Sequence, residues 1–175
     1  MRYDFEYKIV ESQRLFKAGF NNTYPYTTGL ATDLDFAVDE SGLWVTYGST
    51  KHDGLLAIAK LDPHRLDVQR EWVTTFKKQD AVNTFIVCGR VYIVVQSEDM
   101  NGAEVKLVYD TYTSKMIELD KVLKLQGESL YLTMLDYNPM ESALHAWGLT
   151  RSWQGELLRY SITVEYDGVR SAGGH

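Results

Sequence analysis

Three oxygen-bearing side chains recur at matching positions along the chain, namely Asp35, Asn83 and Asp136. Carboxylate and amide oxygens are ligands of Ca²⁺, which takes six to eight oxygens at about 2.3–2.6 Å. Two carboxylates held close together need a compensating cation or a raised pKa. The chemistry indicated by this triplet is therefore binding of a hard cation. The alternative is that the three side chains lie at strand ends and face water.

The triplet belongs to a repeat of about 50 residues. Asn83 follows Asp35 by 48 residues, and Asp136 follows Asn83 by 53. Two other features keep the same spacing: the apolar runs Leu43-Trp44-Val45, Val91-Tyr92-Ile93 and Leu144-His145-Ala146, and the turn pairs Asp53-Gly54, Asn101-Gly102 and Gln154-Gly155. A period near 50 made of short apolar strands is typical of a β-propeller with one four-stranded blade per repeat. Because the first strand of each blade lines the central channel, we expect the triplet to converge there.

The rest of the chain divides into about three and a half such blades. The first complete repeat has expected strands at 33–39, 43–47, 55–61 and 68–74, the second spans about Ala81 to Leu119, and the third runs from near Leu130 to Tyr166. Arg2 to Leu15 is interpreted as the outer half of another blade, because Tyr3-Asp4 returns as Tyr109-Asp110 in a third strand. Residues 1–166 are predicted to form one partial propeller domain, and 167–175 a disordered tail.

Composition excludes several classes of protein. With 45% apolar and 13% aromatic residues, the 175-residue chain can bury a sizeable core. Its 18 basic residues are scattered among 24 acidic ones, which argues against a nucleic-acid partner. No apolar run approaches the roughly 18 residues of a membrane span. The first residues do not form a secretory signal, and the single cysteine, Cys88, would by itself indicate a reducing compartment.

Other motifs are few. Asn21-Asn22-Thr23 is an N-glycosylation sequon on Asn21, although such triplets also occur by chance. Trp44, Trp72 and Trp147 are expected in the core. No nucleophile elbow, phosphate loop or zinc-ligand pattern is present in the sequence.

Several blocks of the sequence together resemble the olfactomedin domain in its usual order. They are residues 33–44, Lys60-Leu61-Asp62-Pro63, residues 83–89, residues 134–139 and Ala143-Leu144-His145-Ala146-Trp147. The resemblance covers nearly the whole chain from Arg2 to about Tyr166. It implies a five-bladed propeller of which this chain contains the C-terminal part, about two blades being absent on the N-terminal side.

The resemblance also implies a site and a function. The family's buried Ca²⁺, often with a Na⁺ beside it, would be held by the side chains of Asp35, Asn83 and Asp136 and by the backbone carbonyls of Thr84 and Leu135. The implied function is a secreted, non-enzymatic interaction or adhesion domain. Its expected partners are extracellular matrix or cell-surface proteins, with self-association as a further possibility.

The chain departs from the family pattern at several places. Cys88 corresponds to one half of a family disulfide whose other cysteine would lie in the absent N-terminal part of the domain. It is therefore expected to be an orphan, with no disulfide partner within this sequence. Thr28-Gly29-Leu30 replaces a Trp-Gly-Gly loop, and a longer hairpin at 148–153 has no evident purpose. Two rival interpretations stay open: a lactonase-like, metal-dependent propeller hydrolase, for which no spare Glu or His is found at the matching places, and a truncated fragment without independent function.

Overall fold

The structure, a computed structural model, describes residues 1–27, 32–98, 102–125, 129–150 and 154–161, and nearly all regular structure in these ranges is antiparallel strand. A hairpin pairs β1 (Arg2–Asp4) with β2 (Ile9–Glu11). The first blade contains β3 (Leu34–Asp39), β4 (Gly42–Ser49), β5 (Leu55–Leu61) and β6 (Val68–Lys77). The second contains β7 (Asn83–Val87), β8 (Arg90–Gln96), β9 (Ala103–Asp110) and β10 (Lys115–Leu125). The third contains β11 (Ser129–Asn138), β12 (Ala143–Thr150) and β13 (Gly155–Ser161).

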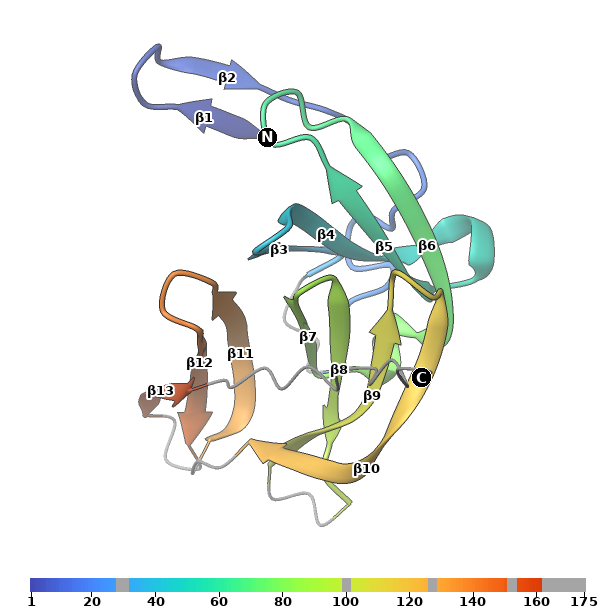
Figure 1. Ribbon diagram of the computed structural model, residues 1–175, viewed down its shortest axis with the longest axis vertical. Helices are drawn as coiled ribbons and strands as arrows, with labels where there is room; N and C mark the ends of the chain where they lie inside the picture. The colour runs from blue at the N-terminus through green and yellow to red at the C-terminus, as the bar shows by residue number, and fades with distance from the viewer. Residues whose placement is uncertain (28–31, 99–101, 126–128, 151–153, 162–175) are drawn as a thin grey trace, which may run out of the picture.

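Strands within each blade are hydrogen-bonded in chain order, as in a propeller. From the hairpin at the top of Figure 1, the three blades follow one another clockwise, with β3, β7 and β11 toward the middle. Two short 3₁₀ helices, η1 (Thr50–His52) and η2 (Lys78–Asp80), lie at connections of the first blade. This arrangement confirms the predicted all-β, propeller-like fold. The predicted end of the second repeat at Leu119 is wrong, because β10 passes an irregularity after Glu118 and continues to Leu125. The predicted tail at 167–175 lies outside the described residues.

A repeated turn identifies the hairpin as the outer half of a blade. In the first two blades an aspartate at the end of the third strand, or directly after it, accepts two backbone N–H groups of the turn. Asp62 accepts from His64 and Arg65 at 2.9 and 2.8 Å, and Asp110 from Tyr112 and Thr113 at 2.8 and 3.1 Å. Asp4 accepts from Glu6 and Tyr7 at 3.0 and 2.9 Å in the same way. β1 and β2 are therefore equivalent to the third and fourth strands of a blade.

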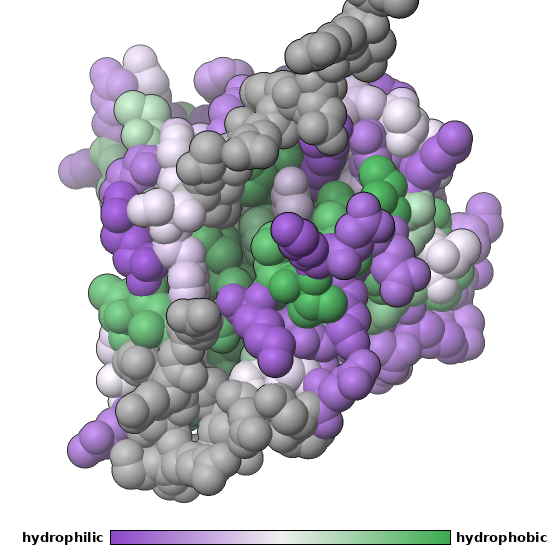
Figure 2. Space-filling view, turned by 60° about the horizontal axis from the view of Figure 1, so that its bottom comes forward, coloured by the Kyte–Doolittle hydropathy of each residue, from purple (hydrophilic) through white to green (hydrophobic). Residues whose placement is uncertain are grey.

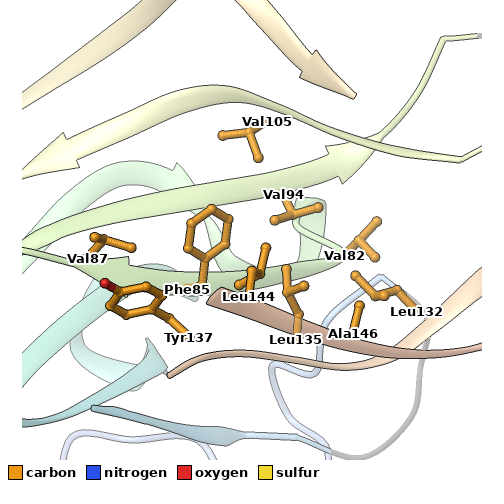
Figure 3. Close-up of a cluster of buried hydrophobic side chains, with 10 residues drawn as sticks. All are labelled: Val82, Phe85, Val87, Val94, Val105, Leu132, Leu135, Tyr137, Leu144 and Ala146. Carbon is orange, nitrogen blue, oxygen red and sulfur yellow. The ribbon is translucent and has the colours of Figure 1, made fainter. Parts of the chain in front are cut away.

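The core lies between neighbouring blades. Alternate residues of a strand face opposite sides, so each blade has two faces. Between the second and third blades, Phe85, Val94 and Val105 pack with Leu135, Leu144 and their neighbours (Figure 3). Between the first and second blades, Trp44, Ile58 and Trp72 pack against Ile86, Val91 and Tyr109. Burial of these apolar side chains stabilises the packing of each blade against the next.

Trp147 is not in the core, contrary to the prediction. Its side chain is 43% exposed, whereas Trp44 and Trp72 are buried. Met134, Trp147 and Leu157 pair across β11, β12 and β13 and form one exposed apolar row on the outer face of the third blade. Side chains on this row have no following blade among the described residues to cover them.

The surface is otherwise mixed in polarity. Figure 2 shows hydrophobic residues gathered near the middle of one face, with hydrophilic residues around them. Within the described ranges, no helix has the length and apolar character needed to cross a membrane.

Gly48 allows the connector before the first blade to lie close against β4. A Cβ at Gly48 would lie 2.3 Å from Cβ of Tyr24, so any side chain must displace the connector. We expect Gly48→Ala to destabilise the protein by about 1–3 kcal/mol, measured by urea unfolding. Gly102→Ala is the matched control, because its Cβ would meet nothing nearer than 3.8 Å. Equal stability of the two variants would show that the connector is not held against β4.

Candidate metal centre

The sequence-predicted ligands lie on three inner strands. Asp35 is on β3, Asn83 and Thr84 are on β7, and Leu135 and Asp136 are on β11. These strands contact one another around the middle of the molecule (Figure 1). Leu135 buries its side chain in the core, so only its backbone carbonyl is available as a ligand. Asp136, the next residue, faces the opposite side of the strand.

Tyr26 joins two of the inner strands at this place. Its hydroxyl donates to Oδ2 of Asp35 at 2.8 Å and lies 2.8 Å from Oγ1 of Thr84. Oγ1 of Thr46 completes the cluster, at 3.2 Å from the Tyr26 hydroxyl and 3.1 Å from Oγ1 of Thr84. Because the three hydroxyls carry one hydrogen each, they can donate at most three of these four contacts at one time. The network fixes one carboxylate oxygen of Asp35 and the position of Thr84.

The two aspartates have perturbed acidity. Burial raises the pKa of Asp35 to about 6, and the negative charge of Asp136 raises it further. The hydrogen bond from Tyr26 and the positive charge of Lys78 lower this pKa and so oppose the shift. The Asp136 side chain is exposed, yet partial withdrawal of water raises the pKa of its carboxyl, with His145 opposing. The Asp35 carboxylate thus sits in an environment that disfavours its ionised form. A bound cation would reverse this preference.

Lys78 places one positive charge beside the network. Its side chain is fully buried, and Nζ donates to the carbonyl of Tyr24 at 3.1 Å and to the carbonyl of Thr32. Nζ also lies 3.7 Å from the centroid of the Tyr26 ring, a cation–π contact. Burial lowers the pKa of Lys78 to about 8, while Asp35 and Asp33 oppose that shift. Since its two described hydrogen bonds go to carbonyls, Lys78 compensates Asp35 only at longer range.

The donor set fits a hard cation better than a soft one. Asn83 is buried, and its Oδ1 accepts the Thr84 N–H at 2.7 Å while keeping a second lone pair. Two carboxylates, one amide oxygen and two carbonyls make an all-oxygen set of the kind that Ca²⁺ takes. In the part of the chain that the structure describes, no group of three or more His, Cys, Asp or Glu residues could hold a metal. Ligation here would therefore need the amide and carbonyl oxygens as well.

The other predicted site residues lie apart from this set. Cys88 lies in the β7–β8 turn at φ +48°, and its N–H and thiol donate to Oε2 of Glu40 at 3.0 and 3.3 Å. Oε1 of Glu40 accepts the Tyr137 hydroxyl at 2.5 Å, so this carboxylate links all three blades. Burial opposes ionisation of Glu40, but the bonds from Tyr137, its own backbone and Cys88 lower its pKa. That Cys88 corresponds to one half of a family disulfide stays a prediction.

Glycosylation of Asn21 also stays a prediction. Asn21 is exposed in a turn at φ +54°, which leaves its side chain accessible. Two sequence departures, Thr28-Gly29-Leu30 and the tip of the 148–153 hairpin, fall outside the described residues.

Sequence comparison defines the class of protein to which this arrangement belongs. The chain is a member of the olfactomedin-like domain family, whose sequence profile matches residues 1–167. Its relatives include the myocilins of Macaca fascicularis, Felis catus and Homo sapiens, which are 38%, 37% and 36% identical to it over 148 residues. Those matches cover 84% of this chain and 29–30% of each myocilin. The chain thus spans about a third of the length of these relatives, and the predicted family resemblance is confirmed.

Proposed function

We propose that this chain is a non-enzymatic, extracellular protein-interaction domain whose inner strands hold one structural Ca²⁺. The observation that carries the proposal is the pair of carboxylates, Asp35 and Asp136, placed on neighbouring inner strands with raised pKa values. Membership of the olfactomedin-like family supports the protein-interaction role, and relatedness to the myocilins supports an extracellular location.

In this proposal each ligand has a distinct task. Asp35 and Asp136 supply negative charge from β3 and β11, while Asn83 supplies a neutral oxygen from β7. The carbonyls of Thr84 and Leu135 would complete the set. When bound, the cation neutralises the carboxylates and ties the three inner strands together. Tyr26 and Thr46 orient Asp35 and Thr84 for this purpose.

A calorimetric titration with CaCl₂ tests the proposal. We expect one Ca²⁺ per chain in the wild type and at least about 100-fold weaker binding in Asp35→Asn and in Asp136→Asn, because each change removes a charged ligand. Asp53→Asn is the control, since Asp53 is an exposed carboxylate that pairs with Lys77. Binding that is unchanged in both site variants would refute the assignment.

The pKa of Asp35 gives a pH dependence with a defined sign. In chelator, Asp35 keeps its proton up to about pH 6 in the folded state but only to about pH 4 when unfolded. The folded state therefore binds more protons in this window, so the contribution of Asp35 to stability falls as the pH rises from about 4 to 6. The measurement is the difference between wild-type and Asp35→Asn unfolding free energies across this range.

Saturating Ca²⁺ should reverse the direction in which the contribution of Asp35 to stability changes with pH. Because Ca²⁺ needs the ionised carboxylate, its stabilising effect should grow as the pH rises through about 6. Parallel pH profiles of wild type and Asp35→Asn, in Ca²⁺ as well as in chelator, would contradict the placement of Asp35 at the metal.

The lactonase-like alternative has less support. A metal-dependent hydrolase needs a base that is poised to activate water. His145 pairs across the sheet with Asp136, but its Nε2 lies 3.2 Å from Oε2 of Glu141 and is engaged there. Lactone hydrolysis that is lost in Asp136→Asn would favour the enzyme over the interaction domain.

A further inference from the structure

Two positive side chains lie directly opposite each other on the first blade. Lys60 on β5 and Arg70 on β6 are cross-strand partners, and Lys60 is in turn opposite Trp44 on β4. Residues opposite each other in antiparallel strands have Cβ atoms about 4.5–5.5 Å apart, and like charges placed there destabilise the sheet. Lys60 is half-buried and Arg70 is exposed, so an anion from outside can reach both.

The chain itself does not balance these two charges. Within the described ranges, neither Lys60 nor Arg70 has an acidic side chain at ion-pair distance. Glu71, which follows Arg70, is on the opposite face of β6 and pairs with Lys17. Asp39 is buried, and its Oδ1 accepts the indole N–H of Trp44 at 2.7 Å. The pair therefore carries two positive charges without a partner carboxylate in this part of the chain.

Buried tryptophans fix the position of both cations. Nζ of Lys60 lies 5.2 Å from the centroid of the Trp44 ring, and Cζ of Arg70 lies 4.9 Å from that of Trp72. The two indole rings are 5.7 Å apart and are buried between the first and second blades. Cation–π contacts thus hold the two side chains on a rigid surface. A guanidinium group over an aromatic ring can still donate from its N–H edge to a carboxylate.

Covering the tryptophans explains each cation but not their adjacency. Lysine and arginine stems commonly lie over apolar surface while the charged group stays in water. A lysine opposite a glutamate would cover the same rings and would form an ion pair instead of a repulsive pair. The arrangement is therefore better suited to an anion that comes from another molecule.

We propose that Lys60 and Arg70 bind the carboxylates of an acidic peptide segment in a partner protein. The planar guanidinium of Arg70 takes one carboxylate through two parallel N–H donors, and the ammonium group of Lys60 takes the same carboxylate or its neighbour. Binding removes the repulsion between the two cations, because the carboxylates neutralise both. This partner chemistry belongs to the protein-interaction function proposed above and rests on it.

A long sulfated glycan fits this surface less well. Its sulfate groups would meet the same two cations, but a polyanion needs a broad basic surface around them. The turn that follows β5 carries Asp62 and Asp67, and the whole chain has a net charge of −6. These negative charges repel a long polyanion more than a short acidic segment that ends at the pair.

Fluorescence anisotropy of a labelled hexaglutamate peptide, titrated with the full chain at low ionic strength, tests the proposal. We expect saturable binding of one peptide per chain that weakens as salt is added. Affinity should fall about tenfold or more in the double variant Lys60→Gln/Arg70→Gln, because it removes charged donors to the carboxylates. In ¹⁵N-labelled protein, the peptide should shift the indole signals of Trp44 and Trp72 and leave that of Trp147 in place.

A matched double variant separates this site from general electrostatics. Lys51→Gln/Lys121→Gln removes the same charge from exposed lysines of η1 and β10, and it should keep the wild-type affinity. Equal affinity loss in the two double variants, or no saturable binding by the wild type, overturns the proposal. Binding of a heparin hexasaccharide but not of hexaglutamate, lost in Lys60→Gln/Arg70→Gln, would identify a sulfated glycan as the ligand and would also overturn it. Because the pair is distinct from the carboxylates of the metal centre, the calcium titration and this assay can fail independently.

Discussion

Lys78→Met should lower the unfolding free energy by about 2–4 kcal/mol. The change keeps most of the side-chain volume but removes the hydrogen bonds that Lys78 donates to the part-buried carbonyls of Tyr24 and Thr32, at about 1–2 kcal/mol each. It also removes a positive charge that favours ionisation of Asp35. Relief from burying an ammonium group, whose cost is reflected in its lowered pKa, offsets part of this loss.

Differential scanning fluorimetry or calorimetry measures the effect as a melting temperature. For a chain of this length, the expected loss corresponds to a fall of about 5–15 °C. Lys77→Met is the matched control, because the neighbouring lysine is exposed and pairs with Asp53 at the surface. That variant should stay within about 0.5 kcal/mol of wild type. Equal melting of the two variants would mean that Lys78 has no structural role at the centre.

Removal of Ca²⁺ should have an effect of similar size. A ligand that binds only the folded state stabilises it by about 4 kcal/mol when present at 1,000 times its dissociation constant. The melting temperature should therefore fall by about 8–16 °C when chelator replaces saturating Ca²⁺. Mg²⁺ should restore less of the loss, because it requires a smaller and more regular octahedral site.

The same melts identify the ligands. In Asp35→Asn and Asp136→Asn, the curves in Ca²⁺ and in chelator should nearly coincide, whereas Asp53→Asn should keep the wild-type difference. A wild-type melt that is indifferent to Ca²⁺ would favour the truncated-fragment interpretation of this chain.

Much of the fold could be predicted because its signals are local. Strand alternation and turn chemistry recur with the blade, as at Asp53-Gly54 and Cys88-Gly89, where both residues adopt positive φ. The phase of that repeat places Asp35, Asn83 and Asp136 on successive inner strands, where the structure has them. The hairpin was also predictable, since Asp4 repeats the turn chemistry of Asp110.

The surroundings of the site could not be predicted in the same way. Tyr26 comes from an irregular connector and Lys78 from a 3₁₀ turn, and neither belongs to the repeat. In the sequence, Lys77-Lys78 looks like an ordinary solvated pair, yet Lys78 is buried and Lys77 is exposed. Only the long-range approach of Tyr24 and Tyr26 to the first blade distinguishes the two lysines.

Trp147 shows a different limit. Its place in an alternating apolar strand predicts burial, and the strand does form. Burial, however, requires a neighbouring blade on that face, and the described residues contain none there. A periodic pattern thus predicts which face a side chain occupies, but not whether another element covers that face.

Luminescence of Tb³⁺, which replaces Ca²⁺ at oxygen sites and is excited through nearby aromatic rings, tests the central claim most directly. Tyr26 is hydrogen-bonded to Asp35, so it lies close enough to sensitise an ion held there. We predict emission that saturates at one Tb³⁺ per chain, is displaced by Ca²⁺, and is lost in Asp35→Asn but kept in Asp53→Asn. The absence of any Ca²⁺-displaceable emission, or equal emission from Asp35→Asn, would contradict a calcium site at the inner strands.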